Sequence, residues 1–379
     1  MKLLEYIKNN NDWKEKLSKE PYYLKIKQSE LYPNLYIFNY NLIKSDFAFE
    51  ICKEARGVII DVKDEKVVCR GFDKFFNYGE SYSSLNNIDW NSAKVQEKID
   101  GSLLKLYYYN AAGEWLIATS SNILAKDSPV KNTGYTFETL FLSAIKKYKC
   151  NTIKEFVNKF HLSEKYTYCF EIVSLYNQIV VKYNDIEIYL LCIRETETGK
   201  EININNNFGL KVPKEYPLHS LQDCLNVLKT FNKNDLIENE GFVVVDKNFN
   251  RIKIKSEEYV AMHYSVSGGF PNYKLLRIVR ENEVDELLNY FPKYKQVIIE
   301  LKNDYNNYIK YLQNKIKAAA AFGKIETRED RKRFALEWKN DNCKEIFKLL
   351  DLDFNLEKFL NSLSDKELFK KIKYYKEES

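Results

Sequence analysis

The spacing of apolar residues changes near residue 270, and this change limits the folds open to the chain. After this point apolar residues recur every three or four positions, as in 284–291 and 297–316, which is typical of helices. Before it, helical spacing is predicted for about residues 1–30, 137–148 and 153–160, and the other apolar runs are short and strand-like. These strand-like runs cover residues 35–40, 55–61, 67–70, 95–107, 168–173, 178–183, 187–194, 240–245 and 251–255. The pattern predicts a mixed domain with β-hairpins, followed by an all-helical module.

Composition sets broader limits. A chain of 379 residues is long enough for two or three domains, and a net charge of +5 permits a polyanionic partner without requiring one. Seven cysteines without a C-x-x-C pair, together with only three histidines, argue against a zinc site and for reduced thiols in an intracellular compartment. The polar start of the chain argues against a signal peptide, and no apolar run has membrane-spanning length. No membrane partner is therefore expected.

The run Lys98-Ile99-Asp100-Gly101-Ser102 lies between two strand-like stretches. Alternation places the side chains of Lys98 and Asp100 on one face, and the Gly-Ser pair allows the chain to bend. A lysine in this position is either a surface ammonium or a nucleophile at the edge of a sheet.

A second informative stretch is the strand Arg251-Ile252-Lys253-Ile254-Lys255. Alternation puts its three basic side chains on one face and its two isoleucines on the other. Three like charges in a row repel, so an anion opposite them would be stabilising. The alternative is a solvated edge strand that its lysines protect from pairing.

These parts together suit attack by the Lys98 amine on the α-phosphorus of a nucleoside triphosphate. Attack needs the neutral amine, and a second ammonium about 5 Å away disfavours protonation by roughly 3 kcal/mol at an effective dielectric of about 20. Lys253 or Lys255 could be that neighbour, and Arg56 and Lys74 could add charge for the phosphates. Carboxylates for a divalent ion, most simply Mg²⁺, would come from Glu171 and Glu240. No P-loop and no dinucleotide-binding fingerprint is present.

The order of these motifs resembles that of the covalent nucleotidyltransferases, and within them the phage-type RNA ligase 1 family. Lys98-Ile99-Asp100-Gly101-Ser102 is similar to motif I, Phe170-Glu171-Ile172 to motif III, Glu240-Gly241-Phe242-Val243-Val244 to motif IV, and Lys253-Ile254-Lys255 to motif V. The resemblance runs from about Tyr36 to about Asp285. It implies an α+β nucleotidyltransferase domain of antiparallel sheets with flanking helices over residues 1–268, and an all-α C-terminal domain over 269–379 that recognises the RNA substrate.

The resemblance also implies an activity and roles for single residues. ATP would adenylate Lys98, and AMP would pass to an RNA 5′-phosphate, which would then be joined to a 3′-hydroxyl with Mg²⁺ or Mn²⁺ as the metal. Nucleotide binding would fall to Tyr40, Arg56, Lys74, Phe76, Asp100, Gly101, Glu171, Glu240, Lys253 and Lys255. The metal-associated carboxylates would be Glu171, Glu240 and Asp285, and Tyr259 matches a further residue that is important in the family.

One segment departs from the family pattern. About twenty residues after its nucleophile the family carries a lysine, whereas here Ile117-Ala118-Thr119-Ser120-Ser121-Asn122 contains no basic residue. Adenylation is therefore the safer expectation and sealing the less safe one.

Three other functions stay open from the sequence: a DNA ligase, a capping guanylyltransferase and a non-catalytic RNA-end-binding protein. The first two, as families, place an OB-fold barrel where this chain has helical spacing. The expected partners are RNA with 5′-phosphate and 3′-hydroxyl ends, such as a broken tRNA, and an end-healing kinase or phosphatase. The Asn- and Lys-rich composition suggests a viral source, which would place the protein in the host cytoplasm.

Overall fold

The computed structural model describes residues 1–204, 209–231, 238–263, 272–322, 327–337 and 355–378. The chain forms two compact units, Met1–Ser267 and Gly268–Ser379. Within the part of the chain that is described, no helix is both long and apolar enough to cross a membrane.

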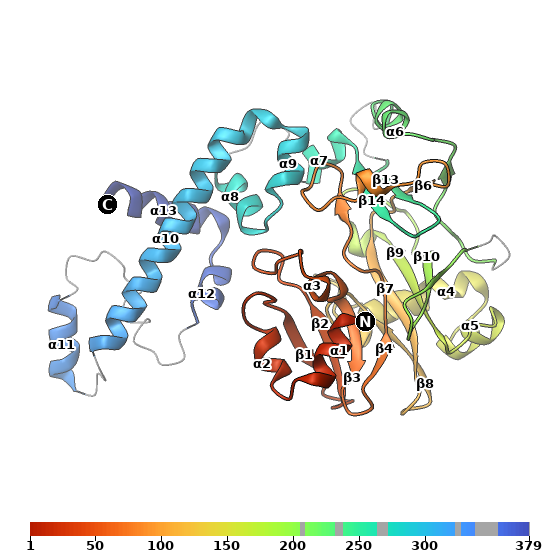
Figure 1. Cartoon of the computed structure of the whole chain (residues 1–379), viewed down its shortest axis with the longest axis horizontal. Coiled ribbons are helices and arrows are strands. Elements are labelled where there is room, and N and C mark those ends of the chain that lie inside the picture. The colour runs from red at the N-terminus through yellow and green to blue at the C-terminus, as the bar shows by residue number, and fades with distance from the viewer. Residues whose placement is uncertain (205–208, 232–237, 264–271, 323–326, 338–354, 379) are drawn as a thin grey trace. The chain divides into compact units, whose positions relative to one another are not determined.

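In the described part of the first unit the strands form three β-sheets, and Figure 1 labels most of these strands. All strand pairs are antiparallel except the pair of β14 with β5. The four-stranded sheet has the order β1 (Lys25–Gln28), β2 (Leu35–Asn39), β3 (Arg56–Asp61), β4 (Lys66–Cys69). One five-stranded sheet has the order β11 (Glu201–Ile202), β10 (Glu187–Glu195), β9 (Tyr166–Val173), β7 (Ser102–Tyr109), β8 (Glu114–Ala118). The other has the order β12 (Glu215–Tyr216), β6 (Lys94–Glu97), β13 (Gly241–Val245), β14 (Arg251–Lys255), β5 (Phe76–Asn77).

Helices flank these sheets, as the sequence predicts for an α+β fold. They are α1 (Lys2–Asn9), α2 (Trp13–Leu17), α3 (Glu50–Glu54), α4 (Phe137–Ile145), α5 (Ile153–Lys159), α6 (Leu221–Leu228) and α7 (Glu257–His263). Single 3₁₀ turns lie at Leu85–Asn87, Ala125–Asp127, Lys146–Tyr148 and Leu175–Asn177. Thr136 is the N-cap residue of helix α4 and forms a capping box with Thr139. Apolar residues of α4 and α5 then pack against β7, β9 and β10 as one buried cluster.

Strand β14 has one buried apolar face and one basic face, as the alternation in its sequence predicts. Ile252 and Ile254 are fully buried and pack with Val244 of β13 and with Cys224 and Leu228 beside them. The opposite face of the same strand therefore carries Arg251, Lys253 and Lys255 toward the other five-stranded sheet. This arrangement makes the basic row part of a cavity.

Two predicted elements are wrong. Residues 178–183 form no strand, because the backbone N–H groups of Val180 and Val181 bond to a carboxylate instead of to a neighbouring strand. Residues 25–28, expected within a helix, form strand β1, in which Ile26 pairs with Phe38 of β2. In both places long-range hydrogen bonds override the local pattern.

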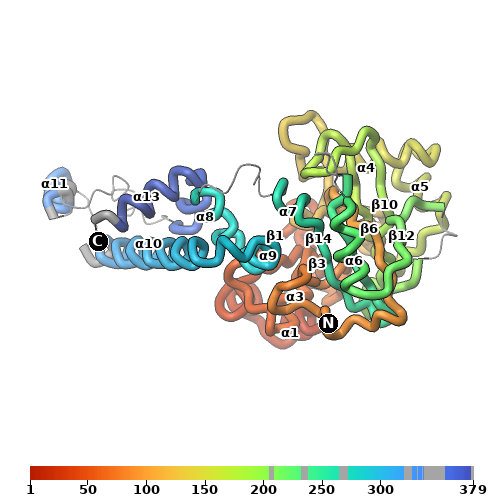
Figure 2. The backbone as a smooth tube through the Cα atoms, turned by 90° about the horizontal axis from the view of Figure 1, so that it is seen from above, coloured from red at the N-terminus to blue at the C-terminus, as the bar shows by residue number. Residues whose placement is uncertain are grey.

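The second unit is helical throughout the part that the structure describes, as its spacing predicts. Its elements are α8 (Asn272–Arg280), α9 (Val284–Tyr290), a 3₁₀ turn (Pro292–Tyr294), α10 (Lys295–Phe322), α11 (Arg328–Glu337), α12 (Leu356–Ser362) and α13 (Asp365–Glu378). Figure 2 shows α8 and α13 beside the long helix α10. Their shared core contains Leu276, Leu312 and Leu368, and Arg280 bonds Asp365 at 2.7 Å.

Candidate active site

The Lys98 segment lies where the two five-stranded sheets approach each other. Strand β6 ends at Glu97, and the Lys98 N–H still bonds to the Gly241 carbonyl of β13 at 2.9 Å. Strand β7 begins at Ser102 and pairs with β9 of the other sheet. Gly101 makes this crossing possible, because a Cβ there would lie only 2.4 Å from the carbonyl oxygen of Ile172.

Asp100 fixes the segment in place. Its carboxylate accepts hydrogen bonds from the Tyr259 hydroxyl at 2.7 Å and from the N–H groups of Val180 and Val181 at 2.9 and 2.7 Å. Asp100 is 2% exposed, and its own N–H donates to the Tyr183 hydroxyl at 3.2 Å. Asp100 thus ties together three segments that are far apart in the sequence, and its predicted contact with a nucleotide stays a prediction.

A cavity of about 310 Å³ opens between the two sheets. Lys98 lies on its wall together with basic side chains of β3 and β14, the carboxylate of Glu171 and several apolar side chains. The lining residues are Arg56, Phe72, Phe75, Gln96, Glu97, Lys98, Ile99, Gly101, Leu103, Glu171, Leu191, Pro213, Val243, Arg251, Lys253 and Lys255. The cavity therefore brings together predicted residues from motifs I, III and V.

Basic side chains from separate segments of the chain gather at this cavity. Burial lowers the pKa of Lys253 well below its ordinary value, and the charges of Arg56, Lys74, Lys98 and Lys255 lower it further. The buried Nη1 of Arg56 has no hydrogen-bond partner in the described part of the chain. Such a cluster is stabilised when an anion enters, because the anion offsets the repulsion and supplies acceptors.

Lys98 itself contacts a carboxylate. Its Nζ lies 2.6 Å from Oε2 of Glu240, which is 3% exposed, and the Lys255 Nζ lies 4.0 Å from Oε1 of the same residue. Sequence reasoning expected an ammonium neighbour beside Lys98 and did not foresee that Glu240 would be its direct partner. Burial raises the pKa of Glu240, and the charges of Lys98 and Lys255 oppose this rise.

Glu171 is the second carboxylate of the site. Burial raises its pKa to about 8, with the Lys98 charge acting against the rise and the Glu240 charge adding to it. A divalent cation bound near Glu171 and Glu240 would relieve this unfavourable pair of negative charges, so the two residues fit a metal ion or its bound waters. No group of three or more metal-ligating side chains occurs among the residues that the structure describes.

Lys74, Tyr40 and Phe76 come together as a separate group. The Lys74 ammonium lies over the rings of Tyr40, Phe47 and Phe76, at 5.2, 5.6 and 5.1 Å from their centroids. Phe76 belongs to β5, which pairs with β14 next to Lys253. The predicted residue Asp285 is an exposed residue of α9 in the second unit, and its metal role stays a prediction.

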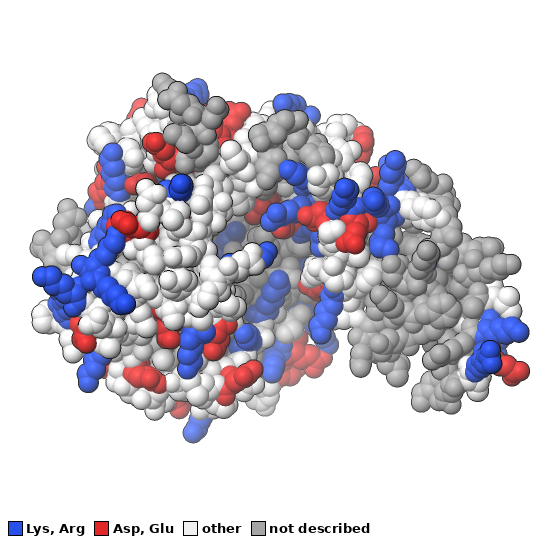
Figure 3. All heavy atoms as spheres, turned by 180° about the vertical axis from the view of Figure 1, so that it is seen from behind, with Lys and Arg blue, Asp and Glu red and all other residues white. Residues whose placement is uncertain are grey.

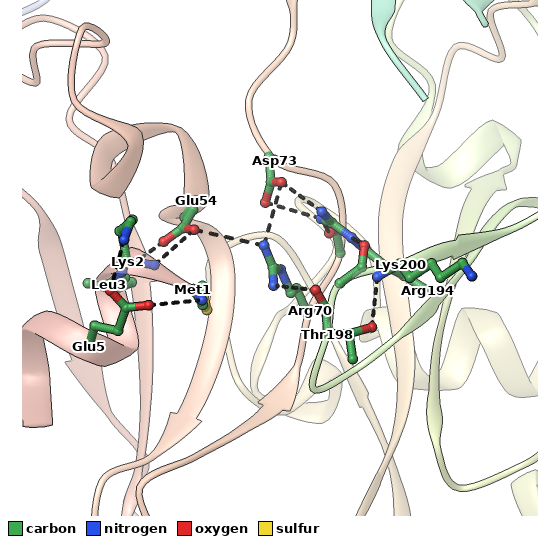
Figure 4. Close-up of polar contacts among 12 residues, drawn as sticks. Met1, Lys2, Leu3, Glu5, Glu54, Arg70, Asp73, Arg194, Thr198 and Lys200 are labelled. Carbon is green, nitrogen blue, oxygen red and sulfur yellow. Dashed lines mark hydrogen bonds and ion pairs between the residues drawn. The ribbon is translucent and has the colours of Figure 1, made fainter. Parts of the chain in front are cut away.

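The segment that carries Lys74 is anchored by an arginine that sequence reasoning missed. Arg194 binds both carboxylate oxygens of Asp73, at 3.1 and 2.7 Å, and donates to the Gly71 carbonyl at 2.5 Å. Figure 4 shows Arg70 beside this pair, between Asp73 and Glu54. Arg194 also donates to the nearby Gly199 carbonyl, but no local signal marks its contacts with Gly71 and Asp73, which lie more than 120 positions away in the sequence.

The segment around Ser120 lacks the basic residue of the family pattern, but Lys105 of β7 lies near this segment. Lys105 is fully buried, and its Nζ donates to the carbonyl of Gly57, the residue after Arg56. Gly57 has a φ of +74°, and a Cβ there would lie 2.6 Å from the Ser120 carbonyl oxygen. The only sequence signal for this contact was a lysine within an apolar run.

The distribution of charge over the surface of the first unit can be compared with the charge of the cavity. On the face shown in Figure 3, acidic and basic side chains are interspersed over the first unit. On this face the first unit therefore has no continuous basic surface, whereas five of the residues that line the cavity are basic. The six cysteines of the described regions are all buried free thiols, in agreement with the prediction.

A lysine at the wall of a cationic cavity between two antiparallel sheets is the arrangement expected of a covalent nucleotidyltransferase. A comparison of the sequence with known protein families shows which family of this class the chain belongs to. The RNA ligase family of the T4 type 1 group matches residues 54–259, and the chain belongs to this family. The matched span includes the predicted residues from Arg56 to Tyr259, whereas Tyr40 and Asp285 lie outside it.

The chain is also similar to individual proteins. It is 32% identical over 287 residues to a protein of Autographa californica nuclear polyhedrosis virus named as a bifunctional polynucleotide kinase/RNA ligase, covering 72% of this chain and 40% of that protein. It is 27% identical over 335 residues to an RNA ligase of Rhodothermus phage RM378, covering 72% of this chain and 74% of the relative. An archaeal ATP-dependent RNA ligase structure is 15% identical with a TM-score of 0.46, covering 86% and 85% of the two chains.

Proposed function

We propose that this protein is an ATP-dependent RNA ligase that joins a 5′-phosphate to a 3′-hydroxyl through a Lys98–AMP intermediate. The observation that carries the proposal is that the half-buried side chains of Lys253 and Arg56 lie on the wall of the same cavity as Lys98. Membership in the RNA ligase family supports the reaction type. The similar viral and phage proteins support the choice of RNA as the substrate.

In the first step the neutral amine of Lys98 attacks the α-phosphorus, the N–P bond forms and pyrophosphate leaves. Arg56 and Lys253 offset the negative charge that develops on the phosphates. The Lys98 amine must lose a proton before attack, and the contacting carboxylate of Glu240 is the nearest group that could take it. Glu171 and Glu240 would hold Mg²⁺ or Mn²⁺, which would supply further positive charge for the phosphates.

In the second step a phosphate oxygen of the RNA attacks the AMP phosphorus and releases the Lys98 amine. In the third step the 3′-hydroxyl of the other end attacks the 5′-phosphate and AMP leaves. The helical second unit, residues 268–379, would select the RNA, for example a broken tRNA. The name of the Autographa californica virus relative supports the proposal that an end-healing kinase works with this chain. The proposed place of action is the host cytoplasm.

The test is incubation with α-labelled ATP and Mg²⁺, followed by a 5′-phosphorylated single-stranded RNA. We expect a labelled protein, and then circular or joined RNA with release of AMP. Lys98→Ala should give no labelled protein, whereas Lys94→Ala should behave like the unsubstituted protein, because Lys94 is an exposed lysine at the start of β6. Labelling with GTP alone would favour a capping guanylyltransferase, and no labelling would favour an RNA-end-binding protein.

A further inference from the structure

A second cavity, of about 390 Å³, adjoins the cavity that contains Lys98, and among its lining residues the function proposed so far uses Lys74 alone. The two cavities share Phe72, Phe75 and Arg251 as lining residues. The rest of its wall combines charged, amide and aromatic side chains. These other lining residues are Asp73, Lys74, Ser84, Arg194, Gly199, Lys200, Glu201, Asn248, Phe249 and Asn250.

One buried ion pair, between Arg251 and Glu201, holds part of the wall of this cavity in place. Arg251 binds both carboxylate oxygens of Glu201 at 2.7 and 2.6 Å, and these side chains are 10% and 7% exposed. The Arg251 guanidinium lies over two rings, at 4.9 Å from the centroid of Phe72 and 5.9 Å from that of Phe249. The wall of the cavity thus combines a planar cation, held by its ion pair, with two aromatic rings.

The turn between β13 and β14 presents Phe249 in a conformation that phenylalanine rarely adopts, with a φ of +62°. Asp246 holds the turn, because its carboxylate accepts from the backbone N–H groups of Asn248 and Asn250 at 2.8 and 3.0 Å. Asp246 is 3% exposed and also accepts from the Asn250 side chain at 2.9 Å. Glycine would adopt this backbone without strain, whereas phenylalanine adopts it at a conformational cost.

The geometry of phosphoryl transfer indicates from which side the RNA phosphate must approach the AMP phosphorus. In the first step pyrophosphate leaves from the side of the α-phosphorus opposite the Lys98 nitrogen. In the second step the N–P bond to Lys98 breaks at the same phosphorus, so the attacking RNA phosphate must enter on the side that pyrophosphate left. The new P–O bond forms there, and the released amine takes up a proton. Lys74, which is proposed to bind the ATP phosphates, also lines the second cavity.

We propose that the second cavity binds the RNA nucleotide that follows the 5′-phosphate at the joining end. The Phe249 ring would stack on the base, and the exposed Lys200 and the amides of Asn248 and Asn250 would contact the strand. Pyrophosphate alone would need the cations but not the aromatic stack. This proposal rests on the proposed function, because it presumes transfer of AMP from Lys98 to RNA.

The test separates the RNA step from the ATP step. Protein that already carries AMP is mixed with a 5′-phosphorylated single-stranded RNA, and the single-turnover rate of AMP transfer is measured below saturation. The same protein is mixed with pyrophosphate, and the rate of ATP formation is measured. Phe249→Gly should slow transfer to RNA about tenfold or more, because stacking on one base is lost, and should leave the pyrophosphate reaction unchanged. Phe249→Trp, which keeps a stacking ring, should retain transfer.

Glu65→Gly is the matched control. Glu65 has a φ of +52° in the turn between β3 and β4, is exposed and lies outside the residues that line this cavity. The control should transfer AMP to RNA like the unsubstituted protein. Equal transfer by Phe249→Gly would overturn the proposal, and so would an equal loss in the pyrophosphate reaction, which would assign the cavity to the ATP phosphates. If the unsubstituted protein forms no AMP adduct, the proposed function fails first and this proposal with it.

Discussion

Replacing Gly101 by alanine should disable adenylation without unfolding the protein. A Cβ at this position would lie 2.4 Å from the carbonyl oxygen of Ile172, 2.8 Å from Cγ1 of Val173 and 3.1 Å from Cγ of Glu171. An ordinary carbon–oxygen contact is about 3.4 Å, so β7 and β9 must separate by roughly 1 Å, which typically costs about 1–3 kcal/mol in a packed core. The shift acts directly on Glu171 and on the segment that carries Lys98.

A misplacement of about 1 Å near reacting atoms lowers a rate by about a hundredfold. We therefore expect Gly101→Ala to slow adduct formation about a hundredfold at saturating ATP, with a melting temperature lowered by only a few degrees. Gly134→Ala is the control, because nothing lies within 4 Å of its added Cβ. Adduct formation by Gly101→Ala within about threefold of the control would refute this account of the crossing between the sheets.

The remaining predictions concern charge, hydrogen bonding, metal and the second unit. The negative charge of ATP phosphates should raise the lowered pKa of Lys253 again. At a pH above the lowered pKa, ATP binding should therefore take up a proton, and ATP affinity should weaken as pH rises toward the ordinary pKa of lysine. Calorimetry in buffers of different ionisation enthalpy should detect this proton uptake, and Lys253→Met should abolish it. Tyr259→Phe should cost about 1.5 kcal/mol of stability in urea unfolding and should be non-additive with Asp100→Asn; additive effects would contradict the hydrogen bond between them. Glu171→Gln should raise the Mg²⁺ concentration for half-maximal adenylation about tenfold. An unchanged Mg²⁺ concentration would show that Glu171 does not contribute to metal binding. A chain shortened to residues 1–267 should still form the adduct but prefer different RNAs, and an unchanged preference would argue against a selecting role for the second unit.

Sequence patterns predicted the parts of the fold that depend on periodicity. The alternation of Arg251 to Lys255 with two isoleucines identified a strand with one buried and one basic face, and the spacing after residue 270 identified the helical unit. These signals are local, because the period of apolar residues reflects the geometry of the single element. The α+β class followed from them and from the family resemblance.

Contacts between distant segments could not be predicted in the same way. Glu240 lies 142 positions after Lys98, and nothing in either segment specifies that the two side chains meet at 2.6 Å. The same holds for Arg194 with Asp73. The stretch 178–183 was predicted as a strand because its apolar residues suit one, but its backbone donors are used by the buried Asp100. Hydrogen-bond partners are decided by the assembled fold rather than by local propensity.

The most direct test of the central claim is to find which residue carries AMP. The protein is incubated with ATP and Mg²⁺ and digested, and the peptide that carries AMP is sequenced by mass spectrometry. We predict one modified site, at Lys98, through an acid-labile bond between phosphorus and nitrogen. Modification of another residue, or full labelling of the Lys98→Ala protein, would contradict the account of this cavity as a lysine adenylation site.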